Sequence, residues 1–459
     1  MSKYIRTCIL FALLVCCMRA DGQTIDNVLH KTGIRKENIG IEIYNLVDKK
    51  SIYSLNSNKL FSIASVNKLF VTAAALKYLG QDYRFKTVIY SDLPDASGII
   101  KGNIYIKGGG DPLFVSENMW FLVNKLIDIG IKNIKGDIIL DDTSFPPADV
   151  YEDNGDSDRA YSAKLSALSV NFNSVAVSTT SGKVPHVALD PQTSSLQLVD
   201  KTRSSSNGTS IEMRREGNKI IVSGTLNNSN YENKIIYRNI ENPSEYFAEV
   251  LKIHLKWRGI EHEGSIIRGK ADTNRTKLFE IESRRLNDIL AEMNKFSNNY
   301  IAEQVMRAIA DKKFGKASDV NKAIELISDY LKEIGLDKDG FEIINGSGFS
   351  RMNRIKPVEM IKFLDYAYRN FSISPEFMNS LSIAGIDGTI RRTHKTDFLT
   401  GNLRAKTGTL TGVRSLAGYL NYKDKVYAFI IAANDPNAYF LMNWEGKILE
   451  DTIKGLQGE

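Results

Sequence analysis

The chain has 459 residues, of which 42% are hydrophobic and 25% charged, so it has the composition of a globular protein large enough for more than one domain. The formal net charge of +6 at pH 7 is a small excess, and the lysines and arginines form no dense stripe. These features argue against nucleic-acid binding. Beyond the first 22 residues, no segment reaches about 18 uncharged apolar residues, so we expect no membrane-spanning helix.

The first 22 residues have the three-part pattern of a secretory signal peptide. Lys3 and Arg6 precede an apolar run from Cys8 to Met18, and Ala20 and Gly22 supply the small residues of a cleavage site. We therefore expect cleavage after residue 22 and an exported protein, periplasmic or otherwise extracytoplasmic.

All three cysteines, Cys8, Cys16 and Cys17, lie within this segment, so the mature chain would contain no disulfide, thiolate nucleophile or cysteine metal site. Val15 and Cys16 make a poor lipobox for Cys17, which disfavours lipid attachment, while peripheral membrane association stays open. The five histidines have no paired ligand spacing, so we expect neither a metal nor another cofactor.

The hydrophobic pattern predicts helices and strands near both ends of the chain and a β-rich region between them. Up to residue 85 we predict a helix over 24–32, paired strands over 39–44 and 51–55, and a helix from Ser65. From 86 to 275 we predict strands at 87–90, 99–107, 137–140, 174–179, 220–223 and 234–237, with helices at 117–129 and 244–257. From 276 we predict helices at 286–292, 299–310, 319–334, 357–368 and 442–456, with strands at 416–422 and 426–433. Strands at both ends indicate one discontinuous domain whose sheet joins them.

The tetrad Ser65-Val66-Asn67-Lys68 lies at the start of an apolar helix and admits two interpretations. In one, Ser65 caps the helix and Lys68 extends its amine to water. In the other, apolar surroundings lower the pKa of Lys68 from about 10.4, and its neutral amine accepts the proton of a nucleophilic Ser65. The tetrad alone does not decide, so partner residues are needed elsewhere.

Two later segments supply such partners. Ser297-Asn298-Asn299 precedes a predicted helix, and Lys406-Thr407-Gly408-Thr409 precedes the C-terminal strands. The motifs S-x-x-K, S-D-N and K-T-G occur together in penicillin-binding proteins and β-lactamases. S-x-N recurs by chance in this sequence, and Lys31-Thr32-Gly33 is a second K-T-G. The signal is therefore the order and context of the three segments.

With these motifs the chain resembles the D-alanyl-D-alanine carboxypeptidase/endopeptidase group of class C low-molecular-weight penicillin-binding proteins. The resemblance extends over nearly the whole mature chain and includes residues 102–112, 165–171, 345–351 and 384–389. Asn298 and Asn345 stand where the family commonly has Asp.

The resemblance implies an α+β fold: a β-lactamase/transpeptidase-like discontinuous domain, with an antiparallel sheet flanked by helices, and inserted β-rich domains. We predict that residues 23–85 and 276–459 form the penicillin-binding serine peptidase domain. Residues 86–275 would be the inserted β-rich region, made of two small domains.

The resemblance also implies the catalytic residues. Ser65 would be the acylated nucleophile and Lys68 the base that deprotonates it. Ser297, assisted by Lys406, would relay a proton to the leaving amine. Because two ammonium groups in one cleft repel each other, one of the two lysines would readily give up its proton.

The same resemblance implies the substrate-binding residues. Asn299 would hydrogen-bond the peptide carbonyl of the substrate. Lys406 and Thr407 would hold the terminal carboxylate of a D-Ala-D-Ala stem peptide or of penicillin. Gly408 would permit close backbone approach. The backbone N–H groups of Thr409 and of the nucleophile would form an oxyanion hole.

The function expected from these residues is that of an exported serine D,D-carboxypeptidase and D,D-endopeptidase. It would act on peptidoglycan stem peptides through an acyl-enzyme, with β-lactams as covalent inhibitors. One alternative is a β-lactamase, which is disfavoured because no E-x-x-L-N segment precedes Lys406. Another is a non-catalytic cell-wall-binding protein of the same fold, which is disfavoured because Ser65 and Lys68 are both present.

Overall fold

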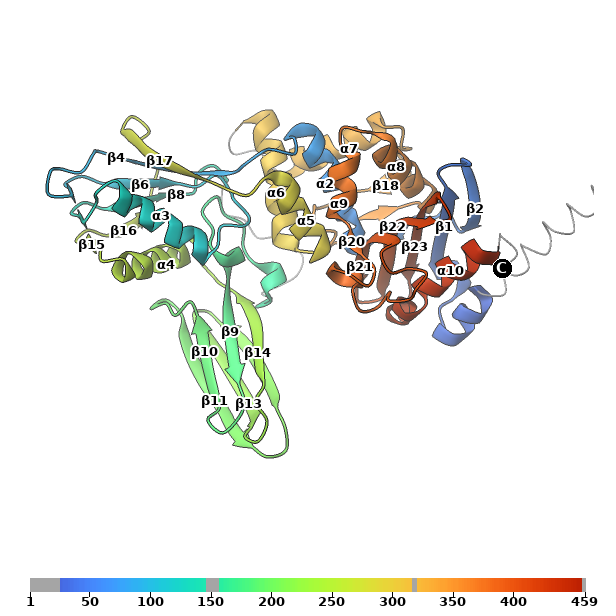
Figure 1. The fold of residues 1–459 in the computed structure, drawn as a ribbon, viewed down its shortest axis with the longest axis horizontal. Helices are drawn as coiled ribbons and strands as arrows, with labels where there is room; N and C mark the ends of the chain where they lie inside the picture. The colour runs from blue at the N-terminus through green and yellow to red at the C-terminus, as the bar shows by residue number, and fades with distance from the viewer. Residues whose placement is uncertain (1–24, 146–156, 316–319, 456–459) are drawn as a thin grey trace, which may run out of the picture. The chain divides into compact units, whose positions relative to one another are not determined.

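The computed structural model describes residues 25–145, 157–315 and 320–455 (Figure 1). The predicted signal peptide, 1–22, lies outside the described residues. The chain divides into two compact units: a first unit of Met1–Gln81, Leu286–Ala302 and Val320–Glu459, and a second unit of Asp82–Arg285 and Glu303–Asp319. Domain boundaries were predicted at 85/86 and 275/276, whereas the units change at 81/82 and 285/286 and again at 302/303 and 319/320.

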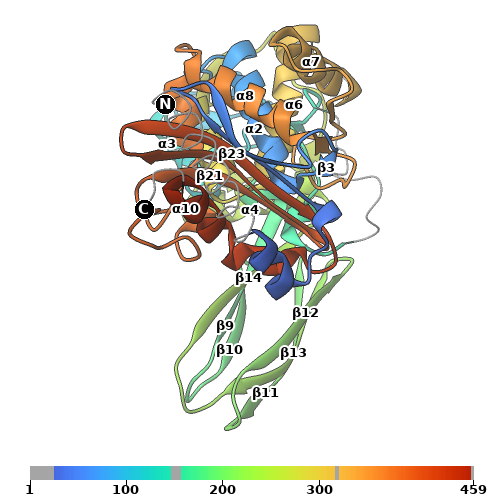
Figure 2. The same cartoon turned by 90° about the vertical axis from the view of Figure 1, so that its right-hand side faces the viewer.

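The first unit is built on a six-stranded antiparallel sheet that joins the two ends of the chain, as predicted. The N-terminal strand β1 pairs with the C-terminal strand β23, from Ile39 opposite Ala433 to Asn45 opposite Tyr427. Across the sheet the strands are β2 (Lys50–Leu55), β1 (Ile39–Asn45), β23 (Lys425–Asn434), β22 (Val413–Tyr422), β21 (Leu403–Leu410) and β20 (Ser382–Ile383). Figure 2 shows β21 and β23 in this sheet.

All three segments of the first unit contribute helices. They are a helix over 25–32, α2 (Lys68–Tyr78), α5 (Leu286–Lys295), α7 (Val320–Glu333), α8 (Pro357–Arg369), α9 (Ser374–Ser380) and α10 (Glu445–Gly455). The 3-10 turns are η1 (Lys36–Asn38), η2 (Ala64–Asn67), η5 (Gly388–Ile390) and η6 (Ala438–Asn443), and a small sheet contains β18 (Phe341–Glu342), β19 (Arg354–Ile355) and β3 (Phe61–Ser62). Helix α6 (Asn299–Phe314) begins in the first unit and continues in the second.

Helices cover both faces of the six-stranded sheet. Successive residues of a strand point to opposite faces, so strand β22 contacts helices on both sides. On β22, Leu416 and Leu420 belong to a core that also contains residues of α10 and of the helix over 25–32. Between them, Tyr419 points the other way and donates a 2.8 Å hydrogen bond to the Leu364 carbonyl of α8. The predicted α+β arrangement, a sheet flanked by helices, is confirmed.

The second unit contains mostly β-structure and two long helices, α3 (Ser116–Asp128) and α4 (Pro243–Trp257). A five-stranded sheet has the order β16 (Ile266–Arg268), β8 (Ile138–Asp141), β6 (Ile104–Lys107), β4 (Lys86–Ser91) and β17 (Thr276–Glu282). A small sheet contains β15 (Glu261–His262), β7 (Asn133–Ile134) and β5 (Ile99–Ile100). Two further three-stranded sheets form an elongated lobe (Figures 1 and 2). One sheet has the order β10 (His186–Asp190), β9 (Ser174–Thr180) and β14 (Asn233–Asn239). The other has the order β11 (Gln197–Ser205), β13 (Lys219–Asn227) and β12 (Ser210–Glu216).

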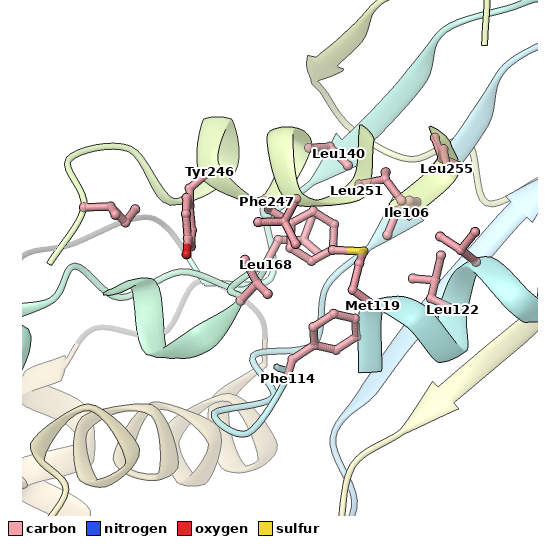
Figure 3. Close-up of a cluster of buried hydrophobic side chains, with 14 of the residues drawn as sticks. Ile106, Phe114, Met119, Leu122, Leu140, Leu168, Tyr246, Phe247, Leu251 and Leu255 are labelled. Carbon is pink, nitrogen blue, oxygen red and sulfur yellow. The ribbon is translucent and has the colours of Figure 1, made fainter. Parts of the chain in front are cut away.

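One hydrophobic core runs through the second unit (Figure 3). Met119 and Leu122 of α3 lie close to Phe247 and Leu251 of α4, and all four side chains are buried. The two helices therefore stabilise this unit by packing their apolar faces together. No helix in the described part of the chain is long and apolar enough to cross a membrane.

Three sequence predictions need correction. The strand predicted at 99–107 is interrupted at Gly102, whose carbonyl lies so close to Gly136 that a Cβ there would be 2.2 Å away. The helix predicted over 442–456 is η6 followed by α10, which begins at Glu445. Strands β11 and β12 were not predicted, because most of their residues are exposed and polar.

The first unit has an aromatic cluster centred on Phe363 of α8. Its ring meets that of Phe70 edge-on, with centroids 4.8 Å apart, and that of Phe377 with centroids 5.8 Å apart. All three rings are at most 1% exposed. Since α2, α8 and α9 each supply one ring, Phe363 ties three helices together.

We expect Phe363→Ala to lower the free energy of unfolding of the first unit by about 3–5 kcal/mol, because it removes a buried ring and leaves a cavity. A urea titration would follow Trp444, with Trp120 and Trp257 replaced by Phe so that the signal comes from the first unit. Phe371→Ala is the matched control, since this ring is 88% exposed; it should cost no more than about 0.5 kcal/mol. Equal losses would contradict the expectation.

Candidate active site

Ser65 lies in η2, the 3-10 turn that leads directly into α2. The N-cap residue of α2 is Asn67, and its side chain makes no capping hydrogen bond. The Ser65 Oγ accepts a hydrogen bond from Lys68 Nζ at 2.8 Å. The side chain of Ser65 therefore contacts Lys68, and the alternative in which Ser65 caps the helix is wrong.

The amine of Lys68 is buried, with the residue 0% exposed. Besides Ser65 Oγ, its Nζ donates to Asn299 Oδ1 at 2.8 Å and to the Ser347 carbonyl at 2.6 Å. These three acceptors are all uncharged. The interpretation in which Lys68 extends to water is contradicted by this burial.

The segment Ser297-Asn298-Asn299 forms the connection between α5 and α6, as predicted. A lysine amine has only donors, so its contact with Asn299 engages the amide oxygen and leaves the NH₂ group available as a donor. Asn298 Oδ1 accepts from the Ile301 N–H at 3.1 Å and so caps α6. An Asn at this middle position therefore serves as well as the Asp common in the family.

The second Ser–Lys pair joins Ser297 to Lys406. Lys406 Nζ donates to Ser297 Oγ at 2.9 Å and to the Thr407 carbonyl at 2.7 Å. Lys406 is 0% exposed. Burial lowers the pKa of its amine well below the ordinary value, and the positive charges of Lys68 and Arg414 lower that pKa further. The structure thus brings both lysines and both serines into one cluster.

Strand β21 carries Lys406 to Thr409 along the turn that holds Ser65. A Cβ on Gly408 would lie 2.3 Å from the Ile63 carbonyl oxygen and 2.3 Å from Ser415 Oγ, so only glycine fits there. Gly408 therefore allows β21 to lie directly against the turn that holds Ser65. Thr407 Oγ1 is 2.8 Å from Thr389 Oγ1.

Sequence reasoning gave no role to Ser347 or Thr389, although both lie in segments that carry the family resemblance. The turn that presents the Ser347 carbonyl is stabilised by Asn345, whose Oδ1 accepts from the Gly348 N–H at 3.0 Å. Asn67 Nδ2 donates to the Asn345 carbonyl at 2.7 Å and holds this turn against η2. An uncharged Asn345 is sufficient for these contacts. Because Ser347 acts through its backbone carbonyl, no side-chain pattern could have identified it.

Among the residues that the structure describes, no group of three or more His, Cys, Asp or Glu side chains could hold a metal ion. The predicted site residues supply two amines, from Lys68 and Lys406, one carboxamide, and the hydroxyl groups of two serines and two threonines. These groups suit nucleophilic attack by serine with proton transfer between neighbouring side chains.

Comparison with known proteins identifies the family. Residues 22–447 match the D-Ala-D-Ala carboxypeptidase 3 (S13) family. The chain belongs to this family. The predicted family and the predicted class of enzyme, a serine-type D-Ala-D-Ala carboxypeptidase, are thereby confirmed.

Two relatives named for this activity cover most of the chain. The D-alanyl-D-alanine carboxypeptidase DacB of Haemophilus influenzae is 26% identical over 409 residues, which are 86% of this chain and 84% of the relative. The D-alanyl-D-alanine carboxypeptidase of Actinomadura sp. (strain R39) is 27% identical over 436 residues, 90% of this chain and 80% of the relative.

Solved structures support the fold. The crystal structure of penicillin binding protein 4 from H. influenzae superposes with a TM-score of 0.77 at 24% identity, over 93% of this chain and 98% of that one. A predatory endopeptidase of Bdellovibrio bacteriovorus, solved with an immunity protein, has a TM-score of 0.56 at 18% identity, over 91% of this chain and 92% of that one. The predicted fold class is confirmed by these matches.

The lowered pKa of Lys406 gives stability a predictable pH dependence. Between that pKa and about 10.4, the unfolded chain binds more protons at this residue than the folded protein does. Lys406 therefore makes the free energy of unfolding rise with pH, by at most about 1.4 kcal/mol per pH unit. Lys406→Met removes this slope, so the stability of the wild type relative to the variant should increase between pH 8 and pH 10.

Urea unfolding of both proteins at pH 8, 9 and 10 measures this difference. Lys338→Met is the control for loss of a solvent-facing amine, because that side chain is 77% exposed. A difference between wild type and Lys406→Met that stays constant, or that shrinks as the pH rises, would contradict the assignment.

Proposed function

We propose that this protein is an exported serine D,D-carboxypeptidase and D,D-endopeptidase that acts on peptidoglycan stem peptides and is inhibited by β-lactams. The observation that carries the proposal is the pair of hydrogen bonds from the buried Lys68 to Ser65 and from the buried Lys406 to Ser297. Membership of the D-Ala-D-Ala carboxypeptidase 3 (S13) family supports the substrate class. Export rests on the sequence pattern of residues 1–22.

In the acylation step, Ser65 Oγ attacks the carbonyl carbon of the penultimate D-Ala. Its proton passes to Lys68, which acts as the base in its neutral form and whose amine already lies 2.8 Å from Oγ. Negative charge then develops on the carbonyl oxygen, where the N–H groups of Ser65 and Thr409 stabilise it. Asn299 donates to the neighbouring peptide carbonyl through the NH₂ group that Lys68 leaves available.

Collapse of this intermediate breaks the bond to the terminal D-Ala, whose nitrogen receives the Ser297 hydroxyl proton. The proton that Lys68 took from Ser65 then reaches Ser297 through Lys406, whose Nζ lies 2.9 Å from Ser297 Oγ, so both lysines end the step as they began it. The product is an ester on Ser65, and water cleaves it to restore the serine. With a β-lactam the broken amide bond is part of a ring, so the leaving nitrogen stays attached and the ester persists.

Lys406 and Thr407 hold the terminal carboxylate of the substrate. Thr407 Oγ1 lies 2.8 Å from Thr389 Oγ1, and either hydroxyl can be the donor in that contact. When Thr389 donates, the Thr407 proton is available to the carboxylate. The same carboxylate is present in penicillins, and the H. influenzae penicillin binding protein 4 has been solved with a β-lactam. Peripheral attachment to a membrane is compatible with this function and is not required by it.

We expect fluorescent penicillin to label the wild type covalently and Ser65→Ala not at all, because only Ser65 can form the ester. Ser54→Ala, on the exposed side of β2, is the matched control and should label normally. The label should persist, and nitrocefin should be hydrolysed slowly. An unlabelled wild type would refute the catalytic assignment, and rapid nitrocefin hydrolysis would identify a β-lactamase instead.

Mass spectrometry of peptidoglycan fragments separates the two peptidase activities. After incubation with the wild type, we expect pentapeptide fragments that have lost one alanine and crosslinked dimers that have become monomers, since both reactions share one acyl-enzyme. Ser65→Ala should produce neither change. If penicillin labels the wild type but neither product forms, the proposed substrate is wrong although the nucleophile is right.

A further inference from the structure

A buried ion pair lies beside the K-T-G strand. Arg414 of β22 is opposite Thr409 of β21 in the sheet register. Its guanidinium binds both carboxylate oxygens of Glu445, the first residue of α10, with Nε–Oε1 at 2.7 Å and Nη2–Oε2 at 2.6 Å. Arg414 is 5% exposed and Glu445 0% exposed. Such a two-point contact fixes the plane and direction of the guanidinium.

The remaining terminal nitrogen of Arg414 points at the candidate site. Nη1 donates to Thr409 Oγ1 at 3.0 Å. Because a guanidinium has donors and no acceptor, the Thr409 oxygen must be the acceptor in this contact. The hydroxyl proton of Thr409 therefore points away from Arg414 and is available to another acceptor.

We propose that Arg414, held by Glu445, is a positioning residue that directs the Thr409 hydroxyl proton toward the terminal carboxylate of the substrate. This inference rests on the proposed function, because it requires a substrate that carries a carboxylate beside β21. It adds a third donor to Lys406 and Thr407, and it makes α10 a part of the support for substrate binding.

The surroundings of Glu445 keep this arrangement in place. Burial alone would raise the pKa of the Glu445 carboxyl, but Arg414 and His394 together hold that pKa below its ordinary value. The carboxylate consequently stays charged and remains hydrogen-bonded to the Arg414 guanidinium. His394 Nε2 lies 3.2 Å from Glu445 Oε2, and its Nδ1 is 2.8 Å from Thr393 Oγ1. The network thus extends from Thr409 through Arg414 and Glu445 to His394.

The test removes the whole ion pair, because removing one member would leave the other charge buried and unpaired. Arg414→Met combined with Glu445→Gln deletes both charges at similar side-chain volume. The wild type, this double variant, Thr409→Val and the triple variant are compared in D-Ala release from an acetylated stem peptide and in acylation by benzylpenicillin. Melting temperatures confirm that each variant is folded.

If Arg414 acts through Thr409, the double variant and Thr409→Val should each raise KM and lower the rate constant of acylation at low penicillin by about tenfold, with kcat within about twofold of the wild type. The triple variant should be no worse than Thr409→Val, since both changes remove the same interaction. Arg414→Lys keeps a donor without the two-point contact, so it should restore part of the loss. If the double variant does not fold, Arg414→Lys is compared with the wild type in its place.

Additive losses in the triple variant, or a fall in kcat with KM unchanged, would overturn the inference, because loosened packing around Ser65 predicts those outcomes. Wild-type kinetics in the double variant would overturn it as well. Each of these results leaves the proposed function standing. A wild type that neither releases D-Ala nor reacts with penicillin would instead refute the proposed function.

Discussion

The rest of the site depends on the burial of two lysine amines that donate hydrogen bonds to the oxygens of neighbouring serines. Lys68 and Lys406 are both 0% exposed, and their acceptors are hydroxyl, carboxamide and backbone carbonyl oxygens. For Lys406, burial and the positive charges of Lys68 and Arg414 lower the pKa of the amine and favour loss of its proton. The cluster can therefore supply both an acceptor for the serine proton and a donor for the leaving group.

Holding these amines in place requires three distant parts of the chain. Lys68 comes from the helix after the N-terminal hairpin, Asn299 from the start of α6, and Lys406 from the K-T-G strand. The pairing of β1 with β23 brings the two ends of the chain into one sheet. Close contact at Gly408 then sets β21 directly against the turn of Ser65, because no side chain separates them.

Uncharged residues occupy positions where the family commonly has acids, and the structure explains why this is tolerated. Asn298 caps α6 and Asn345 closes the turn that presents Ser347, and both do so as hydrogen-bond acceptors. Glu445, in contrast, is fully buried and bound to Arg414. Its carboxylate binds the Arg414 guanidinium through two hydrogen bonds and orients it beside Thr409.

The sequence by itself determined the order of the three motifs, and their resemblance to a known family then implied the α+β class and the candidate residues. Only the tertiary structure decided that Lys68 is buried and Ser65 is not a helix cap, since burial depends on what packs over a helix. Ser347, Thr389, Arg414 and Glu445 were missed for the same reason. They act through a backbone carbonyl or through contacts between different strands and helices. The spacing of residues along the chain does not indicate which side chains meet in the folded protein.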